Sequence, residues 1–372
     1  MSVYLDIVKR YDVDGIHFDY IRYPETEGPT LPRGSDVGYN PESVGRFQRA
    51  TGRTDVPAPD DEAWIRWRRQ QVTQLMRRIS IEARAINPRI KVSAAAIPWG
   101  RPPVTLADFE NAAPMQRIFQ NWQSWLSEGL LDLAVPMNYA REHDERVRGW
   151  FNGWIAREKR HKTDRRLAVG IDGYLSAPED VLAQVARVRS PESRARADGV
   201  SFFSYFSPSL RPTPSAATGA AVTQAAGSAA AAAQTRPAVA RAAPAPPTQA
   251  AEPDRLDFVG RGVGNVRPAF TAPAPVPAMP WIERPTRGFI AGTVVDAGAH
   301  AVEASTIRIR KTGWFRKTTR TTTDANGWFG MTRLSPGTYY IRLEDRGGKA
   351  GRERVELVVN AGAVARATLV AK

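Results

Sequence analysis

Val13–Pro24 reads VDGIHFDYIRYP, and its first half alternates with the period of a β-strand. Ile16 and Phe18 fall on one face of this strand. His17 and Asp19 fall on the other face. A strand that is apolar on one face and ends in polar groups on the other fits a small parallel barrel, in which helices cover the outside and the chemistry lies at the carboxyl ends of the strands. We therefore expect Asp19 to lie at such an end.

The composition excludes several classes of site. The chain has 372 residues, which is long enough for two domains or more, and 42% of them are hydrophobic, which is enough for a packed core. It contains no cysteine, so a disulfide, a thiolate zinc site and a Cys nucleophile are excluded. No apolar run approaches the ~20 residues of a membrane span, and Met1 leads directly into a predicted amphipathic helix, 2–11, rather than a signal peptide.

The net charge of +14 favours anionic neighbours such as nucleic acid, cell-wall polymers or membrane headgroups. An Arg- and Ala-rich genomic composition alone can also produce this charge. No recognised nucleic-acid-binding module accompanies it, so we expect no specific nucleic-acid partner.

Residues 1–206 alternate between strands and helices, which predicts an α/β fold with right-handed parallel crossovers. A closed (β/α)₈ barrel takes about 250 residues. We therefore expect only strands four to eight of such a barrel, with the first three β/α units missing and two strand edges exposed. The predicted strands are 13–19, 89–97, 131–139, 167–174 and 199–205; the predicted helices are 2–11, 60–86, 115–128, 145–159 and 178–188, with a Pro/Gly-rich loop at 25–59.

The rest of the chain divides into two further parts. Residues 207–285 are rich in Ala, Pro and Thr, a composition that cannot bury a core and predicts a disordered linker. Residues 286–372 have an all-β pattern of seven short strands with turns at 324–327 and 334–337, which predicts a small β-sandwich.

Four segments of the first part follow one another in the order of the motifs of a known family. They are VDGIHFDYIRYP (13–24), WIRWRR (64–69), LDLAVPMNY (131–139) and LAVGIDGY (167–174). They resemble the fourth-strand motif, the next helix, and the sixth and seventh strands of the glycosyl hydrolase-like family 10 proteins. More loosely, they resemble the chitinase-type (family 18) glycosidases. The resemblance implies a (β/α)₈ barrel, hydrolysis of a glycosidic bond in an extracellular or cell-wall polysaccharide, and an extracytoplasmic or secreted location. Ile21 stands where the chitinase-type motif has its catalytic Glu, which argues against chitinase chemistry.

Two segments of the third part, GFIAGTVVDAGAHAVEASTIRI (288–309) and TTDANGWFGMTRLSPGTYYIRL (322–343), resemble the carboxypeptidase regulatory-like β-sandwich. Such modules are usually accessory. The resemblance therefore implies a supporting role, with attachment to a cell surface or wall as one possibility.

Glycoside hydrolysis needs a group that protonates the leaving oxygen and a second group that acts as nucleophile or activates water. Asp19 is the candidate general acid/base, although an Asp here could instead hold Arg22 or a neighbouring strand. Asp172 and Glu142 are the candidates for the second carboxylate, and the missing strands are another source. A further route is substrate assistance, in which an N-acetyl group attacks and Tyr139 orients it.

The candidate substrate-binding residues lie at or just past the predicted strand ends. Aromatic faces there can stack on sugars, an Asn can bond hydroxyls, and an Arg can bind an anionic sugar. His17 could tune the pKa of Asp19 or bind a hydroxyl. Packing at the barrel rim would explain the same residues without any function. The set is His17, Arg22, Tyr23, Trp99, Asn138, Tyr139 and Tyr174, whereas Arg68 and Arg69 are expected to be solvated.

No metal or cofactor is predicted. The chain has four His residues and no HxH or HExxH motif, and it has no Gly-rich phosphate loop and no Rossmann fingerprint. Two functions remain. One is a glycosidase, and the other is a carbohydrate-binding or surface-assembly protein without catalysis.

Overall fold

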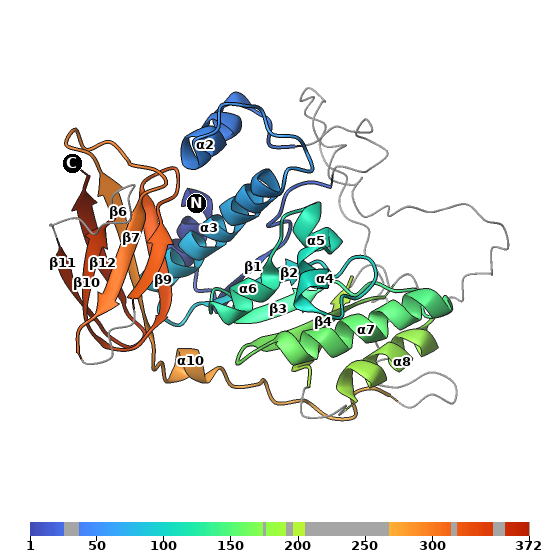
Figure 1. Cartoon of the computed structure of the whole chain (residues 1–372). Helices are drawn as coiled ribbons and strands as arrows, with labels where there is room; N and C mark the ends of the chain where they lie inside the picture. Colours follow the sequence, from blue (N-terminus) through green and yellow to red (C-terminus); the bar gives the residue numbers. More distant parts are fainter. Residues whose placement is uncertain are drawn as a thin grey trace, which may run out of the picture.

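The computed structural model describes residues 1–25, 37–173, 176–190, 196–204, 268–313, 318–344 and 354–371. These residues form a region of helices around a parallel sheet, followed by an all-β region (Figure 1). Most of the predicted linker 207–285 lies outside the described residues, and so does Tyr174.

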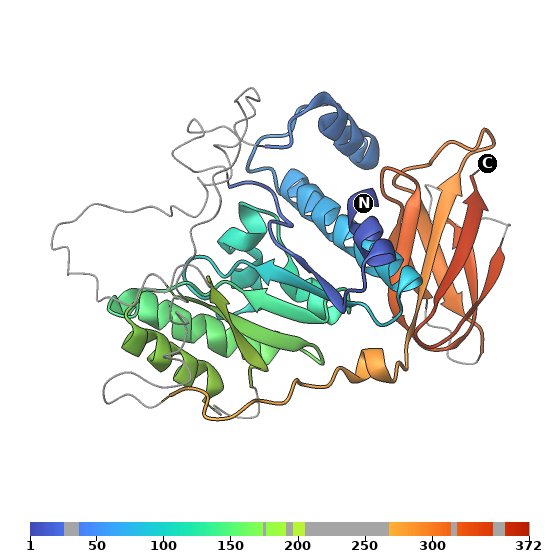
Figure 2. The same ribbon diagram turned by 180° about the vertical axis from the view of Figure 1, so that it is seen from behind.

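Five parallel strands form an open half-barrel sheet in the order β1-β2-β3-β4-β5. The predicted α/β sheet is therefore confirmed in its strand number and direction. The helices that follow the strands pack against its convex face, and Figure 2 shows the sheet from the opposite side. The strands are β1 (Gly15–Phe18), β2 (Lys91–Ala96), β3 (Leu133–Pro136), β4 (Arg166–Asp172) and β5 (Gly199–Phe203).

Local sequence signals explain where the long helices begin. The side chain of Asp61 accepts the backbone N–H groups of Ala63 and Trp64 and so caps α3. Asp144 caps α7 in the same way. The long helices of this region are α1 (Ser2–Arg10), α3 (Glu62–Ile86), α7 (Glu145–His161) and α8 (Pro178–Arg189).

Two predictions about the helices are wrong. The predicted loop 25–59 contains a helix, α2 (Pro41–Thr51), which Asn40 caps at its start and Gly52 ends in the left-handed conformation. The predicted helix 115–128 is two short helices, because Phe119 has a positive φ of 57° between them. These are α5 (Ala113–Gln116) and α6 (Trp122–Ser127), and α4 (Leu106–Glu110) precedes them.

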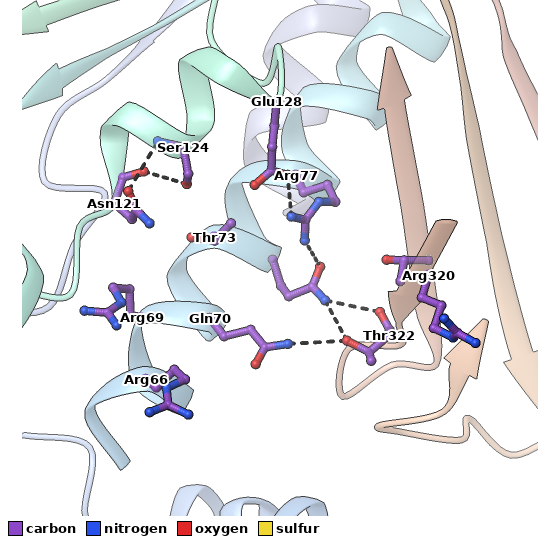
Figure 3. A pocket seen from close by; sticks show the side chains of 12 residues that line it. Arg66, Arg69, Gln70, Thr73, Arg77, Asn121, Ser124, Glu128, Arg320 and Thr322 are labelled. Carbon is purple, nitrogen blue, oxygen red and sulfur yellow. Dashed lines mark hydrogen bonds and ion pairs between the residues drawn. The ribbon is translucent and has the colours of Figure 1, made fainter. Parts of the chain in front are cut away.

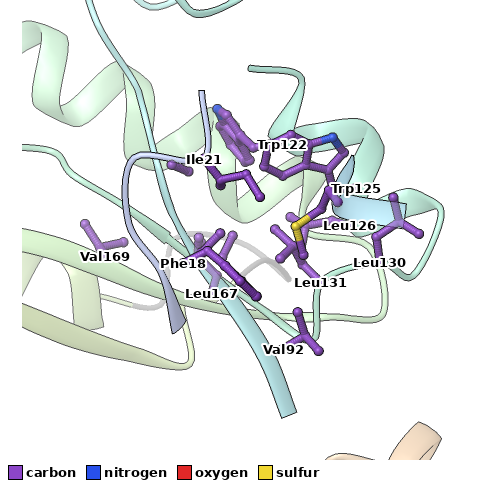
Figure 4. Close-up of a cluster of buried hydrophobic side chains, with 14 of the residues drawn as sticks. Phe18, Ile21, Val92, Trp122, Trp125, Leu126, Leu130, Leu131, Leu167 and Val169 are labelled. Atoms are coloured by element: carbon purple, nitrogen blue, oxygen red, sulfur yellow. The ribbon is translucent and has the colours of Figure 1, made fainter. Parts of the chain in front are cut away.

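The main hydrophobic core lies between the sheet and its helices (Figure 4). Phe18 of β1 and Val92 of β2 lie in this core together with the indole rings of Trp122 and Trp125. The register pairs Phe18 with Ala94, so β1 and β2 present the same face to the helices. The opposite, concave face carries His17, as its alternation predicts.

Gly15 permits the close approach of β1 to β2. A Cβ atom at this position would lie 2.8 Å from the backbone oxygen of Lys91. Real Cβ atoms do not approach a backbone oxygen so closely, so the glycine of the VDGIHF motif is required by the packing of two backbones.

Arg68 corrects the expectation of a solvated side chain. It is fully buried, and its guanidinium group lies 4.1 Å from the centre of the Phe119 ring and 5.0 Å from that of Trp64. Its Nη2 donates to the backbone oxygen of Pro59. The arginine of the WIRWRR segment is therefore part of the packing between α3 and the loops around it.

The C-terminal region forms two sheets that enclose a second core, and the seven predicted strands are confirmed. The sheet orders are β11-β10-β7-β8 and β12-β6-β9, with β12 and β6 parallel. Buried side chains such as Ile290, Ile309 and Phe329 fill the space between the sheets. The strands are β6 (Gly288–Val295), β7 (Thr306–Lys311), β8 (Thr318–Thr322), β9 (Trp328–Leu334), β10 (Gly337–Leu343), β11 (Val355–Val359) and β12 (Val364–Val370).

The β-sandwich packs directly on α3, and Figures 1 and 2 show this helix between the two regions. Ile81 of α3 forms a buried cluster with Ala291 and Trp328 of the sandwich. The indole N–H of Trp328 donates to Glu82 at 2.8 Å. The sandwich is therefore held against the helical region by an apolar contact with polar bonds at its rim.

A short helix, α10 (Pro280–Glu283), lies within the C-terminal end of the predicted linker. The indole N–H of Trp281 donates to Asp132 at 2.7 Å, and Arg166 of β4 donates to the backbone oxygen of Ala278 at 3.1 Å. This end of the linker therefore contacts the helical region. None of the described helices is both apolar enough and long enough to span a membrane.

Candidate functional site

The carboxyl ends of the five strands bring most of the predicted site residues to one edge of the sheet. Asp19 follows β1 directly, and Trp99 lies three residues after β2 ends. Asn138 and Tyr139 follow β3, and Asp172 is the last residue of β4. Parallel strands end at the same edge, so residues far apart in the sequence meet there.

Asp19 is exposed at this edge. Its Oδ1 accepts the backbone N–H of Tyr20 at 2.8 Å, and Tyr20 itself has a positive φ of 54°. This turn moves the chain away from the strand immediately after the carboxylate. Asp19 therefore has an oxygen fixed by the backbone while its side chain stays open to solvent.

His17 lies on the same face as Asp19, two residues earlier. Its Nδ1 is 2.9 Å from the Oγ of Ser93 on β2. Partial burial lowers the pKa of His17, and the negative charge of Asp19 opposes this shift. The shift favours the neutral imidazole. In this form Nδ1 can either donate to the Oγ of Ser93 or accept from it, depending on the tautomer.

Arg22 lies against two aromatic rings at the edge of the sheet formed by the carboxyl ends of the strands. The centre of its guanidinium group is 4.6 Å from the Tyr20 ring and 5.3 Å from the Trp99 ring. Burial lowers the pKa of Arg22, and the charges of Tyr20, Glu25 and Asp19 oppose that effect. Tyr20 was missed in the sequence because its position gives no periodic signal, yet it is 54% exposed beside the candidate acid.

Asn138 is buried, and a hydrogen bond to a residue of α7 fixes its side chain. Its Nδ2 donates to Oε2 of Glu158 on α7 at 2.9 Å. Burial raises the pKa of Glu158 to about 8, although the bond from Asn138 and the charge of Lys159 act in the opposite direction. Glu158 is thus a carboxyl group that carries its proton at neutral pH. The helical pattern of α7 could not distinguish it from a solvated Glu.

The aromatic candidates have different surroundings. Tyr139 stacks on Phe203 of β5 with 5.7 Å between ring centres, and Phe203 is 52% exposed. Tyr23 packs edge-on against Phe119 at 5.1 Å, on the side of the main core. Tyr139 therefore lies at the candidate edge, whereas the ring of Tyr23 contributes to packing.

The two candidates for the second carboxylate are both buried. Asp172 lies on the concave face, in register with Phe203, and its Oδ2 accepts the backbone N–H of Ala140 at 2.9 Å. Glu142 forms an ion pair with Arg187 of α8 and a hydrogen bond with Gln184. Of the three predicted carboxylates, Asp19 alone is exposed.

Among the described residues, no group of three or more His, Cys, Asp or Glu side chains is placed so that it could hold a metal ion.

The comparisons with known families agree with both resemblances. The family described as Glycosyl hydrolase-like 10 matches residues 1–165, and the Carboxypeptidase regulatory-like domain matches residues 290–371. Among curated proteins, Glycosyl hydrolase DigH of Escherichia coli strain K12 is 28% identical over 141 residues, which cover 37% of this chain and 28% of that protein. The Shigella flexneri protein of the same name gives the same figures. The aligned part thus spans about 28% of the length of these relatives.

Two pilin structures are weakly similar to this chain. The major pilin subunit BcpA of Bacillus cereus has a TM-score of 0.18 and 16% identity, covering 23% of this chain and 30% of that chain. The pilus 2b backbone protein of group B streptococcus has a TM-score of 0.19 and 14% identity, covering 22% of this chain and 40% of that chain. Scores this low carry no argument about fold or function.

Proposed function

We propose that residues 1–206, of which 1–165 match the Glycosyl hydrolase-like 10 family, act on a polysaccharide as a glycoside hydrolase, with β1–β5 as strands four to eight of a (β/α)₈ barrel. The observation that carries the proposal is the exposed carboxylate of Asp19 at the end of β1, beside the Tyr20–Arg22–Trp99 stack. A carboxylate at a strand end can supply one of the two groups that this chemistry requires, and the aromatic and cationic groups beside it can contact the sugar.

In this proposal Asp19 protonates the glycosidic oxygen as the bond to the leaving sugar breaks, and the sugar carbon bonds either to the second carboxylate or to a water that this carboxylate deprotonates. In the first case Asp19 then takes the proton from the water that releases the sugar from the carboxylate. Asp172 is a better second carboxylate than Glu142, because it ends a strand on the concave face whereas Arg187 neutralises Glu142. The two carboxyl groups need a separation of about 5–5.5 Å for retention or about 6.5–9.5 Å for inversion.

The remaining groups would bind the sugar. Trp99 and Tyr139 offer aromatic faces, and Arg22 offers a charge suited to an anionic sugar unit. Asn138, fixed by Glu158, would bond a hydroxyl group.

We further propose a division into a hydrolase-like part (1–206), a linker (207–285) and an accessory sandwich (286–372). In this scheme the substrate is an extracellular or cell-wall polysaccharide, and the protein works outside the cytoplasm. The sandwich would then help to attach it to a cell surface or wall.

The test is release of reducing ends by the full chain from a panel of neutral and anionic polysaccharides. Asp19→Asn should abolish the release, because the amide cannot donate a proton to the leaving oxygen. Asp12→Asn is the matched control, since Asp12 is exposed and lies before β1, at the other end of the strand. Full turnover by Asp19→Asn would rule out the catalytic role of Asp19.

A second candidate is a carbohydrate-binding protein without catalysis. The burial of Asp172 and Glu142 favours it, as does Ile21 in the position of the chitinase-type Glu. Retention of the chain on immobilised polysaccharide, without product from any member of the panel, would support this candidate over hydrolysis.

A further inference from the structure

A hollow lies away from the strand ends, where the β-sandwich meets the helical region. It has a volume of about 450 Å³, and α3, α6 and the edge strand β8 line it. Figure 3 shows Arg66 and Arg69 projecting from α3 on one side and Arg320 from the sandwich on the other. None of the glycosidase candidates lines this cavity. The lining residues are Arg66, Arg69, Gln70, Thr73, Gln74, Arg77, Asn121, Ser124, Glu128, Arg320, Thr321 and Thr322.

The charge of this lining is strongly positive. It includes four arginines but a single carboxylate, Glu128. Arg77 is neutralised by that carboxylate at 2.5 Å, and Arg320 is paired with Glu344 at 2.9 Å. The excess charge of the cavity therefore comes from Arg66 and Arg69.

Arg66 and Arg69 are one helical turn apart on the same side of α3, so their positive charges repel each other. Arg66 is 70% exposed at its side chain, and its ion pair with Glu62 is long, at 3.9 Å. Arg69 is half-buried, and its Nη1 donates to the backbone oxygen of Met115 at 3.2 Å. Burial lowers the pKa of Arg69, an effect that Glu110 opposes and Arg66 adds to. A bound anion would offset both the cost of burying the charge of Arg69 and the repulsion between the two arginines.

The other lining groups are hydrogen-bonding side chains. The amides of Gln70 and Gln74 both donate to Thr322, and the side-chain oxygen of Gln74 accepts from Arg77 at 2.6 Å, so these bonds fix the orientation of both glutamines. Hydroxyl groups of Ser124 and Thr321 add further polar atoms. The described lining contains no aromatic ring, so it lacks the stacking platform that a neutral sugar uses. Recognition here would depend on charge and hydrogen bonds.

We propose that this cavity binds a small anionic ligand through its carboxylate or phosphate groups, with Arg66 and Arg69 as the charged contacts. The volume falls within the range of roughly 300–1,000 Å³ that small-molecule sites occupy. Bidentate pairing with arginine is the strongest contact that a carboxylate or phosphate makes with a side chain. A ligand in this position touches both α3 and β8, so it also stabilises the contact between the helical region and the sandwich.

The test is calorimetric titration of the full chain with citrate, glucuronate and inorganic phosphate, at about 150 mM salt so that exposed charges are screened. We expect saturable binding at one site, weakened about tenfold or more in Arg66→Gln/Arg69→Gln, because the variant loses both of the charged contacts proposed for the anion. Tighter binding of citrate and glucuronate would identify a carboxylate ligand, and tighter binding of phosphate a phosphate ester. Either result supports the site.

The matched control is Arg89→Gln/Arg284→Gln, which removes the same charge from two exposed positions outside the cavity. Its affinity for each anion should equal that of the unmodified chain. The single variant Arg66→Gln guards against misfolding, because its side chain is mostly exposed, and it should still lose affinity severalfold. Equal weakening in the control pair, or no saturable binding of any of the three anions, would overturn the proposal.

Discussion

The guanidinium group of Arg22 lies 5.3 Å from the centre of the Trp99 ring, and this contact joins the loop after β1 to the loop after β2. The two residues are far apart in sequence, and they meet because their strands are parallel neighbours in register. The ring of Tyr20, at 4.6 Å, lies against the same guanidinium group. The loops after β1 and β2 are therefore connected by cation–π contacts of Arg22 with two aromatic rings.

This contact predicts that Trp99→Ala weakens the binding of polysaccharide to the full chain. The change removes the aromatic face proposed to contact the sugar, and one such contact contributes about 0.5–2 kcal/mol, so we expect a loss of roughly 2- to 30-fold. Affinity electrophoresis in gels containing the polysaccharide measures it.

The control for that variant is Trp150→Ala. Trp150 forms a similar pair with Arg146 at 5.4 Å, but both residues belong to α7 and not to a loop that directly follows a strand. Its loss should leave the mobility in polysaccharide gels unchanged. Equal retardation of both variants and the unmodified chain would exclude Trp99 from the binding surface.

The raised pKa of Glu158 leads us to predict that the free energy of unfolding depends on pH. Its pKa rises from the ordinary 4.5 to about 8 in the folded chain. Between these values the folded protein holds a proton that the unfolded chain releases, so this group makes the free energy of unfolding fall as the pH rises, by up to about 1.4 kcal/mol per unit. Glu158→Gln removes the titration and should flatten this slope, as measured by urea unfolding from pH 5 to pH 8.

Glu145→Gln is the matched control for the pH dependence. Glu145 lies at the start of the same helix with 89% of its side chain exposed, so its removal should leave the slope as it was. If Glu158→Gln also left the slope unchanged, the carboxyl group would not be protonated in the folded chain at neutral pH.

Patterns within one element predicted much of the fold. The alternation in VDGIHFDY gave the face of His17 and Asp19, and Asp61 marked the start of α3 because a cap is a local interaction. The burial of Arg68 was not predictable, because it depends on Phe119, which reaches the site from a distant turn. The proton on Glu158 likewise depends on tertiary burial, which the sequence of α7 does not encode.

Gly15 predicts a steric requirement at the start of β1. Gly15→Ala would place a methyl group 2.8 Å from the Lys91 backbone oxygen, and neither backbone can move without disturbing the pairing of β1 with β2. We expect a loss of about 1–3 kcal/mol in the free energy of unfolding. Gly149→Ala is the control, because nothing lies within 4 Å of the added atom and alanine favours the α7 helix. Equal stability of the two variants would contradict the close approach.

Glu82 predicts how the sandwich is held on α3. Burial alone would raise its pKa, but hydrogen bonds from Arg366 and Trp328 lower the pKa below its ordinary value. This stabilisation is therefore fully present above the ordinary pKa and is lost as the pH falls through the lower value of the folded chain. Glu82→Gln weakens the bond from Trp328, 2.8 Å long, and should cost about 1–2 kcal/mol.

Hydrogen exchange measures the effect of Glu82→Gln where it should appear, in the amides of β9 and β12 that face α3. Glu62→Gln, on the same helix with 92% of its side chain exposed, is the control and should change neither strand. Because Ile81, Ala291 and Trp328 still form their buried cluster, the sandwich should stay docked, with faster exchange rather than separation. Unchanged exchange in β9 and β12 would mean that the apolar cluster alone holds the two regions together.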